Sequence, residues 1–443
     1  MKNLFVILAA GKGTRMKSSV SKVLHKVCQT SMIEIVIDKA ILCCNNGNNH
    51  LAIVCSDENI EAITKICNAK SKNATFSTYI QKQRLGTGHA VKTALDDLPD
   101  DFDKICVLYG DSPLFEPQTI ANILQCKNSI TFAGFIENNP LLQYGRFITE
   151  GQKLLEIVEF KDASPTQKQI TFFNSGLVGG GFVDFKNLVN KIQNNNSQSE
   201  FYLTDIAKLS GGCGFVECDK VESLGVNTMQ DLGVVEQIMQ NNLRQHFMTN
   251  GVHLIEPSSV FFSLQTSIEP DVTIEPSVVF RGKVQISSGC VIKSFSYIED
   301  STIGANCSIG PFARFRGGSK LGEACKIGNF VEVKASHLAS GVKAGHLAYI
   351  GDGQIGQNTN IGAGAVFCNY DGTNKHKTIV GDNVFIGSNT SLVAPITIGD
   401  DAIIAAGSVA TKTINPEELY ISRPIPNHIQ QGATRLKNKT KKT

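Results

Sequence analysis

The sequence predicts an α/β protein made of two different halves, a Rossmann-like N-terminal domain and a C-terminal parallel β-helix. Three observations lead to this fold class. Apolar runs alternate with helical patterns up to about residue 228, one proline-free helical stretch follows, and a six-residue apolar period occupies most of the remainder. The length of 443 residues agrees with two domains, since domains commonly contain about 100–200 residues.

In the first half, short apolar runs alternate with longer periodic segments. We expect strands over 4–9, 51–55 and 105–109, and helices over 32–44, 58–68 and 88–98. This alternation predicts a parallel sheet with helices on both faces, and such sheets bind ligands at the carboxyl ends of their strands. Glycine motifs at 11–13 and 110–111 follow predicted strands, and a third at 86–88 has no evident strand before it.

One helix separates the halves. Residues Met229–Gly251 lack proline and place apolar side chains three and four positions apart. We therefore predict a linker helix at 229–249, between a first domain at 1–228 and a second at 250–443.

From about Ser267, an apolar residue recurs every six positions. The members of the series are Ile268, Ile274, Phe280, Ile286, Ile292, Ile298, Ile303, Ile309, Phe315, Leu321, Ile327, Val333, Ile355, Ile361, Phe367, Val380, Ile386, Leu392, Ile398 and Ile404. Period six predicts a parallel β-helix in which three short sides complete each coil and the apolar residue points inward. The period breaks at 333–355 and 367–380, and we expect both insertions to form projecting loops rich in binding residues.

The overall charge is nearly balanced, with 42 basic and 40 acidic residues. A dedicated nucleic-acid-binding protein usually carries a large basic excess, so we expect no nucleic-acid partner. The last nine residues hold five cations and no acid, which leaves 37 basic against 40 acidic residues elsewhere. We interpret this basic tail as a solvated end.

The thirteen cysteines include no Cys-x-x-Cys pair, which predicts free thiols in a reducing compartment. No apolar run approaches the roughly 18 residues of a membrane-spanning helix. We therefore expect a cytoplasmic protein without membrane insertion.

A glycine-containing loop follows the first predicted strand. Its glycines allow backbone amides to approach phosphate oxygens, and Lys12 and Arg15 add positive charge. The loop is no Rossmann fingerprint, because Met16 stands at the third glycine position, and no Gly-Lys-Ser/Thr makes it a Walker loop. An ordinary turn would explain a bare Gly-x-Gly, but the string continues to Lys22, which can offset polyphosphate charge.

Two oxygen-bearing side chains are candidate Mg²⁺ ligands. Asp111 follows the predicted strand ending at Tyr109, and Asn227 lies in a Gly-Val-Asn string. Mg²⁺ prefers oxygen ligands and bridges phosphates. Two alternatives stay open: Asp111 could cap a helix near Pro113, and Asn227 could be a turn residue.

Seven strings of the first half occur in a family order: L-A-A-G-K-G-T-R-M (8–16), Q-x-x-x-L-G-T-G-H-A (81–90), Y-G-D (109–111), Y-G-R (144–146), I-V-E-F-K-D-A (157–163), F-N-S-G (173–176) and G-V-N (225–227). They resemble the sugar nucleotidyltransferase family. Six strings of the second half are more specific: F-A-R-F-R (312–316), G-N-F-V-E-V-K (328–334), K-A-G-H-L-A-Y-I-G-D (343–352), N-I-G-A-G (360–364), C-N-Y-D-G-T-N-K-H-K-T (368–378) and I-S-R (421–423).

With these strings the chain resembles, nearly end to end, the bacterial bifunctional N-acetylglucosamine-1-phosphate uridyltransferase/glucosamine-1-phosphate N-acetyltransferase family. The resemblance implies a nucleotidyltransferase domain and a left-handed β-helix, usually trimeric with the acyl site between subunits. It also implies acetylation of glucosamine 1-phosphate by acetyl-CoA, then uridylyl transfer from UTP with release of pyrophosphate. The product, UDP-N-acetylglucosamine, would supply peptidoglycan and lipopolysaccharide synthesis.

The resemblance also implies site residues. In the first domain UTP and the sugar nucleotide would be held by Leu8, Ala9, Ala10, Gly11, Arg15, Lys22, Gln81, Gly86, Thr87, Tyr109, Gly110, Asp111, Gly145, Glu159, Asn174 and Asn227. Of these, Gln81, Gly86 and Thr87 would read uracil, Asp111 and Asn227 would hold Mg²⁺, and Gly145, Glu159 and Asn174 would hold the sugar.

In the second domain His346 would be the general base. Glucosamine 1-phosphate would be held by Arg316, Lys334, Tyr349, Asn360 and Lys375. Acetyl-CoA would be held by Ala363, Asn369, Tyr370, Ser388, Ala406 and Arg423.

Residue chemistry agrees with these roles. An ammonium cannot attack a thioester, so acetyl transfer needs a base that works near neutral pH, which suits His346. A dianionic sugar phosphate favours a cluster such as Arg316, Lys334 and Lys375. A structural loop histidine is the alternative for His346. Two other functions also stay open, a nucleotidyltransferase whose β-helix only oligomerises or regulates, and a non-catalytic scaffold.

Four residues depart from the family pattern without removing a proposed ligand. They are Ser21 in place of the usual Pro, Arg84 in place of the common Gln, Gln143 in the approach to Tyr144-Gly145, and Gly317 in place of the usual Pro.

Overall fold

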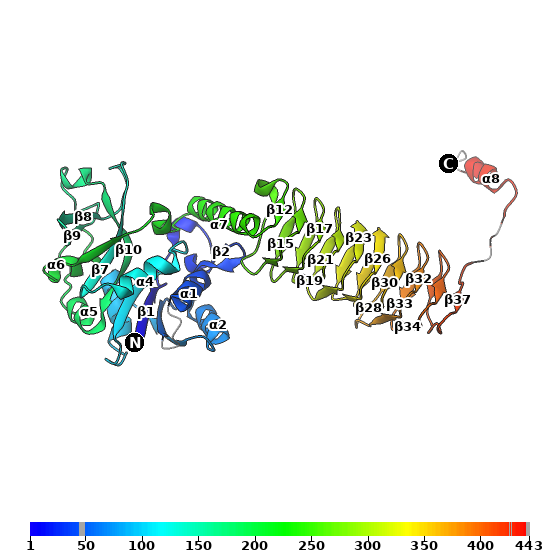
Figure 1. The fold of residues 1–443 in the computed structure, drawn as a ribbon, viewed down its shortest axis with the longest axis horizontal. Helices are drawn as coiled ribbons and strands as arrows, with labels where there is room; N and C mark the ends of the chain where they lie inside the picture. Colours follow the sequence, from blue (N-terminus) through cyan, green and yellow to red (C-terminus); the bar gives the residue numbers. More distant parts are fainter. Residues whose placement is uncertain (44–48, 425, 427, 440–443) are drawn as a thin grey trace. The chain divides into compact units, whose positions relative to one another are not determined.

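The computed structural model describes residues 1–43, 49–424, 426 and 428–439, although the side chains of 436, 438 and 439 lie outside this description (Figure 1). The chain divides into two compact units, Met1–Met239 and Gln240–Thr443. The boundary between the units lies within helix α7 (Met229–Thr249), so each unit includes part of this helix. The end of the helix predicted at 32–44 lies outside the described residues.

The first unit is built on one mixed sheet, in the order β11-β7-β10-β6-β1-β4-β5, with a β8–β9 hairpin on β10. Its strands are β1 (Asn3–Leu8), β4 (Asn49–Cys55), β5 (Thr75–Ile80), β6 (Lys104–Tyr109), β7 (Ile130–Ile136), β8 (Arg146–Glu150), β9 (Lys153–Val158), β10 (Phe172–Gly181) and β11 (Gly214–Glu217). A separate pair is formed by β2 (Lys26–Val27) and β3 (Thr30–Ser31). The apolar runs thus form the central strands, and β5 precedes the glycine motif at 86–88.

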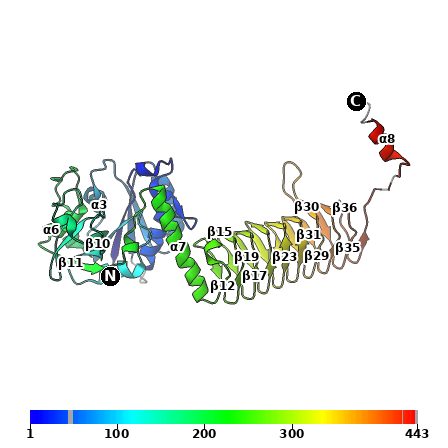
Figure 2. The ribbon, with the colours of Figure 1, turned by 90° about the horizontal axis from the view of Figure 1, so that it is seen from above.

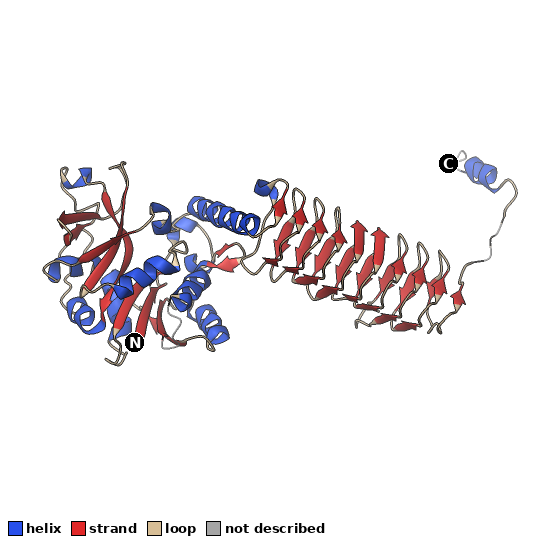
Figure 3. Ribbon diagram, viewed as in Figure 1, coloured by secondary structure: helices blue, strands red, loops and turns tan. Residues whose placement is uncertain are grey.

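Helices cover both faces of this sheet, as the sequence predicts (Figure 3). One face packs against α3 (Thr87–Leu95), α5 (Phe182–Val189) and α6 (Ile206–Leu209). The other packs against α1 (Met32–Leu42), α2 (Ile60–Lys70) and α4 (Pro117–Gln125).

One feature of the sheet differs from the parallel arrangement predicted. Strands β1, β4, β5 and β6 are parallel, but β10 runs antiparallel to both β6 and β7. A parallel strand needs a crossover, usually helical, and no α-helix lies between β7 and β10.

The second unit is a parallel β-helix of three sheets. Sheet A runs from β12 (His253–Leu254) to β37 (Leu419–Tyr420), sheet B from β15 (Val279–Arg281) to β36 (Val409–Ala410), and sheet C from β13 (Ser267–Ile268) to β34 (Ile396–Ile398). The chain passes from A to B to C in each coil, and all neighbouring strands are parallel, as in the left-handed hexapeptide fold predicted. Every member of the predicted six-residue series is buried in one continuous core.

The expectation of a projecting loop at 333–355 is wrong. Residues 334–354 continue the β-helix and form β25 (His337–Leu338), β26 (Lys343–His346) and β27 (Tyr349–Gly351). Their inward side chains, Leu338, Ala344 and Ile350, are fully buried. The spacing of inward-pointing residues is five instead of six at two places, from Val333 to Leu338 and from Ile350 to Ile355. These short spacings and the small size of Ala344 conceal the period in the sequence.

The second break does form a loop. Residues 369–377 leave the corner between sheets B and C, between β30 (Val366–Cys368) and β31 (Thr378–Val380). Figure 2 shows this loop standing out from the coils. The tail contains a short helix, α8 (Gly432–Lys439).

Candidate active sites

Lys22 is held close to the loop that follows β1. The loop turns at Gly13, whose φ is 60°, and a Cβ on Gly13 would lie 2.7 Å from the Cβ of Lys22. Only glycine accommodates both the positive φ and this close approach. Gly13 of the predicted loop therefore allows Lys22 to lie at the carboxyl ends of the strands.

Four predicted side chains meet near the carboxyl ends of β1 and β6. The Lys22 ammonium donates to the Asp111 carboxylate and lies 3.3 Å from Asn227 Oδ1, which also accepts from Arg15 Nη2 at 2.8 Å. The oxygens of Asp111 and Asn227 thus face one cation. One carboxylate with one amide oxygen is a donor set that fits Mg²⁺, which commonly takes water and phosphate oxygens as its other ligands.

The start of α7 holds Asn227 in this cluster. The Asp231 carboxylate accepts from the backbone amides of Asn227 and Thr228 at 3.0 and 2.8 Å, and Val226 N donates to the Asp111 carbonyl at 2.9 Å. The alternative assignment of Asp111 as a helix cap is wrong, because α4 begins at Pro117 and its N-cap is Glu116.

The segment between β5 and α3 contributes Gln81, Gly86 and Thr87. Gly86 has a φ of 111°, and a Cβ there would lie 2.6 Å from the Phe201 carbonyl oxygen, so the chain can pass only as glycine. Gln81 Nε2 donates to the Gly86 carbonyl at 3.2 Å. The Thr87 hydroxyl accepts from Leu203 N at 3.1 Å, which fixes the start of α3.

These segments enclose a cavity of about 320 Å³. Predicted residues line much of it, namely Leu8, Ala9, Ala10, Gly11, Lys22, Gln81, Gly86, Thr87, Tyr109 and Asp111. The lining also includes Lys12, which was expected to add positive charge there, and four residues that were not predicted to bind the ligand, namely Val23, Arg84, Ala90 and Glu200. Predicted residues outside this lining are Arg15, Gly110, Gly145, Glu159, Asn174 and Asn227. Of these, Gly110 joins β6 to β1 through a 2.9 Å bond from its amide to the Leu8 carbonyl.

The three residues predicted to hold the sugar form a second group. Asn174 N donates to the Gly145 carbonyl at 2.9 Å, and a Cβ on Gly145 would lie 3.5 Å from Glu159 Oε1. Burial raises the pKa of Glu159, whose Oε1 accepts from the Thr204 hydroxyl at 3.1 Å.

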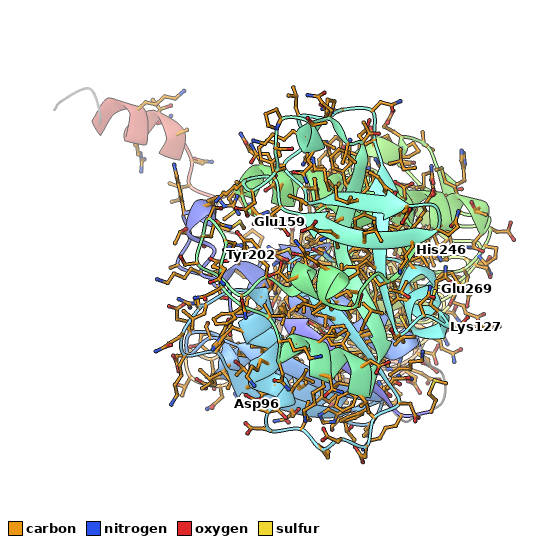
Figure 4. The ribbon with its side chains drawn as sticks, turned by 90° about the vertical axis from the view of Figure 1, so that its left-hand side faces the viewer. Asp96, Lys127, Glu159, Tyr202, His246 and Glu269 are labelled. Carbon is orange, nitrogen blue, oxygen red and sulfur yellow. The ribbon has the colours of Figure 1, made fainter. Side chains whose placement is uncertain are left out.

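Tyr109 lines the cavity and lies near enough to this group to be affected by the charge of Glu159. Its pKa is raised by burial and by the charges of Glu159 and Asp111. Glu159 and Tyr202 line a neighbouring acidic hollow and lie close together in Figure 4.

In the second unit, the B–C corner gathers cationic side chains. Arg316 at the end of β21 (Arg314–Arg316) pairs in register with Lys334 of β24 (Glu332–Lys334), which pairs with Gly351. The loop 369–377 leaves the same corner and brings Lys375 to Lys334, whose ammonium lowers the pKa of Lys375.

Sheet B carries two further groups beside these cations. Arg316 Nη1 lies 3.0 Å from the Glu332 carboxylate. Tyr349 pairs in register with Glu332, and its hydroxyl lies 2.5 Å from where a Cβ on Gly351 would be. The absence of a side chain at Gly351 therefore makes room for the Tyr349 phenol beside the corner.

The A–B corner carries a column of equivalent residues in successive coils, each two positions after the inward-pointing residue of sheet A. Its members are Asn329, His346, Ala363, Ser388 and Ala406. The last of them accepts a hydrogen bond from Arg423 Nε at 2.8 Å. The predicted base and four predicted acetyl-CoA residues, Arg423 included, therefore follow one line along the β-helix.

His346 is exposed and has one side-chain partner. Its Nδ1 lies 2.5 Å from Asn329 Oδ1, in the preceding coil. An amide oxygen only accepts, so this bond places the ring hydrogen on Nδ1 and leaves the lone pair on Nε2. Sequence reasoning missed Asn329, because only the register of β23 (Lys326–Asn329) against β26 shows the pairing.

Three predicted residues lie away from their groups within this chain. Asn369 and Tyr370 belong to the B–C loop, not to the A–B column, and Asn369 Nδ2 donates to the Asp352 carboxylate. Asn360 starts β29 (Asn360–Ile361) on sheet A, whereas Arg316 and Lys334 lie at the far edge of sheet B.

Some features are absent from the part of the chain that the structure describes. It contains no group of three or more His, Cys, Asp and Glu side chains arranged for a metal ion. None of its helices is both long and apolar enough to cross a membrane. Its free cysteines include Cys55, Cys67, Cys126, Cys213, Cys218, Cys290, Cys307, Cys325 and Cys368.

Family profiles match both halves. The MobA-like NTP transferase domain matches residues 5–145, the bacterial transferase hexapeptide (six repeats) matches 300–335, and the hexapeptide repeat of succinyl-transferase matches 377–412. Bifunctional protein GlmU of Bartonella bacilliformis is 42% identical over 95% of this chain and 94% of its own length. The chain belongs to the bifunctional GlmU family.

Two other members are similarly close. GlmU of Paramagnetospirillum magneticum is 40% identical over 98% of this chain and 96% of its own, and that of Zymomonas mobilis is 40% identical over 99% and 98%. GlmU membership confirms the predicted bifunctional enzyme, which joins uridylyl transfer and acetyl transfer in UDP-N-acetylglucosamine synthesis. A scaffold and a β-helix that only oligomerises are therefore wrong as functions.

Two departures from the GlmU pattern have structural partners. The Ser21 hydroxyl accepts from Asn59 Nδ2 at 3.0 Å, and the same buried amide donates to the Ala9 carbonyl at 2.9 Å. Arg84 Nε donates to the Ala10 carbonyl at 2.8 Å. Both residues thus support the loop after β1, while nothing in the structure explains Gln143 or Gly317.

Proposed function

We propose that the two groups of residues described above are two separate active sites, with a uridylyltransferase domain at 1–228, a linker helix at 229–249 and an acetyltransferase domain at 250–443. The separation itself supports this proposal, because the nucleotide cavity and the His346 column lie in different compact units. Acetylation comes first, and the acetylated sugar phosphate is then the acceptor in the first domain.

In the first domain, the 320 Å³ cavity holds UTP. Gln81, Gly86 and Thr87 present amide, carbonyl and hydroxyl groups for uracil, and Leu8 to Gly11 border the nucleotide. Arg15 and Lys22 neutralise phosphate charge, which an in-line attack on the α-phosphate needs more than it needs a base. The sugar phosphate occupies the group of Gly145, Glu159 and Asn174, with Tyr109 between sugar and nucleotide.

Asp111 and Asn227 hold Mg²⁺ in this proposal. When bound, the ion supplies charge neutralisation for the phosphates. The convergence of both oxygens on the Lys22 ammonium supports the assignment, since the two oxygens already accept hydrogen bonds from one cation. Lys22 then turns from these oxygens to the nucleotide phosphates.

In the second domain, Nε2 of His346 takes a proton from the ammonium of glucosamine 1-phosphate. The freed amine attacks the thioester carbon, the carbon–sulfur bond breaks, and coenzyme A leaves as the thiol after it gains a proton. Arg316, Lys334 and Lys375 bind the phosphate dianion, which relieves the repulsion that lowers the pKa of Lys375. The Ala363–Ser388–Ala406–Arg423 line holds acetyl-CoA with its thioester toward His346.

The acetyltransferase site is completed by a trimer. Asn360 lies on sheet A while Arg316 and Lys334 lie at the far edge of sheet B, so a second copy brings the missing face to each site. A stacked, exposed ridge next to Asn329 and His346 supports such contact. It consists of Phe295, Phe312, Phe330 and Leu347, all with positive φ and each more than 40% exposed.

One pair of variants tests the two-site proposal. We expect His346→Ala to lower acetyl transfer by at least about 10²-fold and to leave uridylyl transfer intact, as loss of a general base predicts. Asp111→Ala should have the reverse effect. Both rates are measured on the same purified chain, so the activity that is kept shows that the unsubstituted domain is folded. Loss of both activities from either folded variant would contradict two separate sites.

A further inference from the structure

Arg146 is a fully buried arginine at the start of β8. It pairs in register with Val158 of β9 and Phe173 of β10, so it lies at the centre of three strands. No carboxylate lies within ion-pair distance of it in the described ranges 1–43 and 49–424. A buried charge is costly unless other groups replace its hydration, so its surroundings need an explanation.

Carbonyl oxygens and aromatic rings take the place of water around this guanidinium. Nη1 donates to the Tyr144 carbonyl, and Nη2 donates to the Pro140 carbonyl at 2.7 Å. The Cζ atom lies 4.9 Å from the ring centroids of both Phe160 and Phe173. Such cation–π contacts are strongest when the site excludes water, as it does here.

Three of the residues that contact Arg146 are next in sequence to a member of the sugar group, the name used below for Gly145, Glu159 and Asn174. Tyr144 precedes Gly145, Phe173 precedes Asn174, and Phe160 follows Glu159. One guanidinium therefore ties together the three backbone segments that carry these residues. The Asn174 N to Gly145 carbonyl bond joins two of the segments directly, and the pairing of Arg146 with Val158 joins the segment of Glu159 to that of Gly145.

We propose that Arg146 is a positioning residue for the sugar phosphate of the uridylyl reaction, a role that rests on the proposed function of Gly145, Glu159 and Asn174. Arginine suits the position because its planar fork reaches two carbonyls while its faces stack on two rings. A lysine has one point charge and can keep only part of this set. Substitution at Arg146 thus spreads the sugar group and leaves the UTP cavity unchanged.

The test measures steady-state uridylyl transfer with Arg146→Met and Arg146→Lys. We expect the KM for N-acetylglucosamine 1-phosphate to rise roughly tenfold or more in Arg146→Met, since small misplacements of binding groups are expensive. The KM for UTP should stay within about twofold, because the UTP cavity is unchanged. A general loss of structure would instead raise the KM values for both substrates. Arg146→Lys should recover part of the sugar affinity. Acetyl transfer on the same chain reports intact folding of the other domain.

Arg244→Met is a matched control. Arg244 is also a buried arginine, and it donates to the Val260 carbonyl at 3.0 Å in the second unit. It should lower thermal stability without raising the KM for the sugar phosphate. If Arg146→Met does not yield folded protein, Phe160→Leu removes one ring face and should raise the sugar KM by a smaller factor.

Asn174→Ala separates failure of this inference from failure of the proposed sugar group. A raised sugar KM in Asn174→Ala with an unchanged value in Arg146→Met would overturn the positioning role alone. An unchanged value in both variants would overturn the sugar group itself. Equal increases in the KM values for sugar phosphate and UTP in Arg146→Met would show a general structural role and also overturn the proposal.

Discussion

Asn329 Oδ1 lies 2.5 Å from Nδ1 of His346, across two neighbouring coils of the β-helix. The contact depends on the register of the coils, because both residues occupy the same position of their hexapeptides. It selects the tautomer in which Nε2 has the free lone pair that a general base needs. Asn329 therefore orients the proposed base without contacting the reacting atoms.

Substitution of this partner tests the orientation. We expect Asn329→Ala to lower kcat of acetyl transfer roughly tenfold, a fraction of the 10²–10⁴ that a general base contributes. Uridylyl transfer should not change. Gln354→Ala on the outer face of sheet C is a control for substitution in the β-helix, since this side chain is exposed. Wild-type acetyl transfer in Asn329→Ala would show that His346 needs no such partner.

The aromatic ridge gives a test of the trimer. The rings of Phe312 and Phe330 stack with centroids 5.2 Å apart, and each lies on a residue with positive φ, a conformation that costs about 1–2 kcal/mol for a residue with a side chain. Exposed rings kept at such a cost indicate a partner surface. We expect Phe312→Ser combined with Phe330→Ser to sediment as a monomer, lose most acetyl transfer and keep uridylyl transfer.

Phe261→Ser controls for removal of an exposed ring, because Phe261 is 46% exposed and lies outside the ridge. It should sediment and react like the wild type. A double variant that remains a trimer with full acetyl transfer would exclude the ridge as the interface. A wild-type monomer with full acetyl transfer would remove the need for a trimer altogether.

The sequence predicts the β-helix well because one physical requirement repeats in every coil: a buried apolar residue every six positions. It fails at 334–354, where the small Ala344 fills a core position and two coils are one residue shorter. Register is also hidden, so the pairing of Asn329 with His346 cannot be predicted from their spacing. The ridge is unexpected for another reason, since bulky residues such as Phe312 seldom adopt positive φ.

In the first domain, motifs locate the cavity but not the groups that support it. The glycine loop predicts phosphate contact, and the structure adds that Gly13 is needed for the approach of Lys22. Arginine side chains are mostly exposed in folded proteins, so nothing in the sequence marks Arg146 as buried. Its place follows from β8 lying between β9 and β10, and β10 is the strand whose direction the alternation of elements does not predict.

Glu159 gives a prediction about pH. Burial raises its pKa in the folded chain above the value in the unfolded chain. At a pH between these two pKa values, the folded state binds a proton that the unfolded state has lost. Stability therefore falls as pH rises through the raised pKa, and the penalty is fully present above it. Glu159→Gln removes the penalty and keeps an oxygen for the Thr204 hydroxyl.

We therefore expect Glu159→Gln to unfold at a higher temperature than the wild type near pH 8, with the difference disappearing toward pH 4, where both side chains are neutral. The same variant should raise the KM for N-acetylglucosamine 1-phosphate, because a carboxylate accepts a sugar hydroxyl more strongly than an amide does. Glu150→Gln, an exposed change on the same hairpin, should alter neither quantity. A Glu159→Gln variant that is less stable than the wild type at pH 8 would mean that the carboxylate is stabilised, not strained, by its buried position.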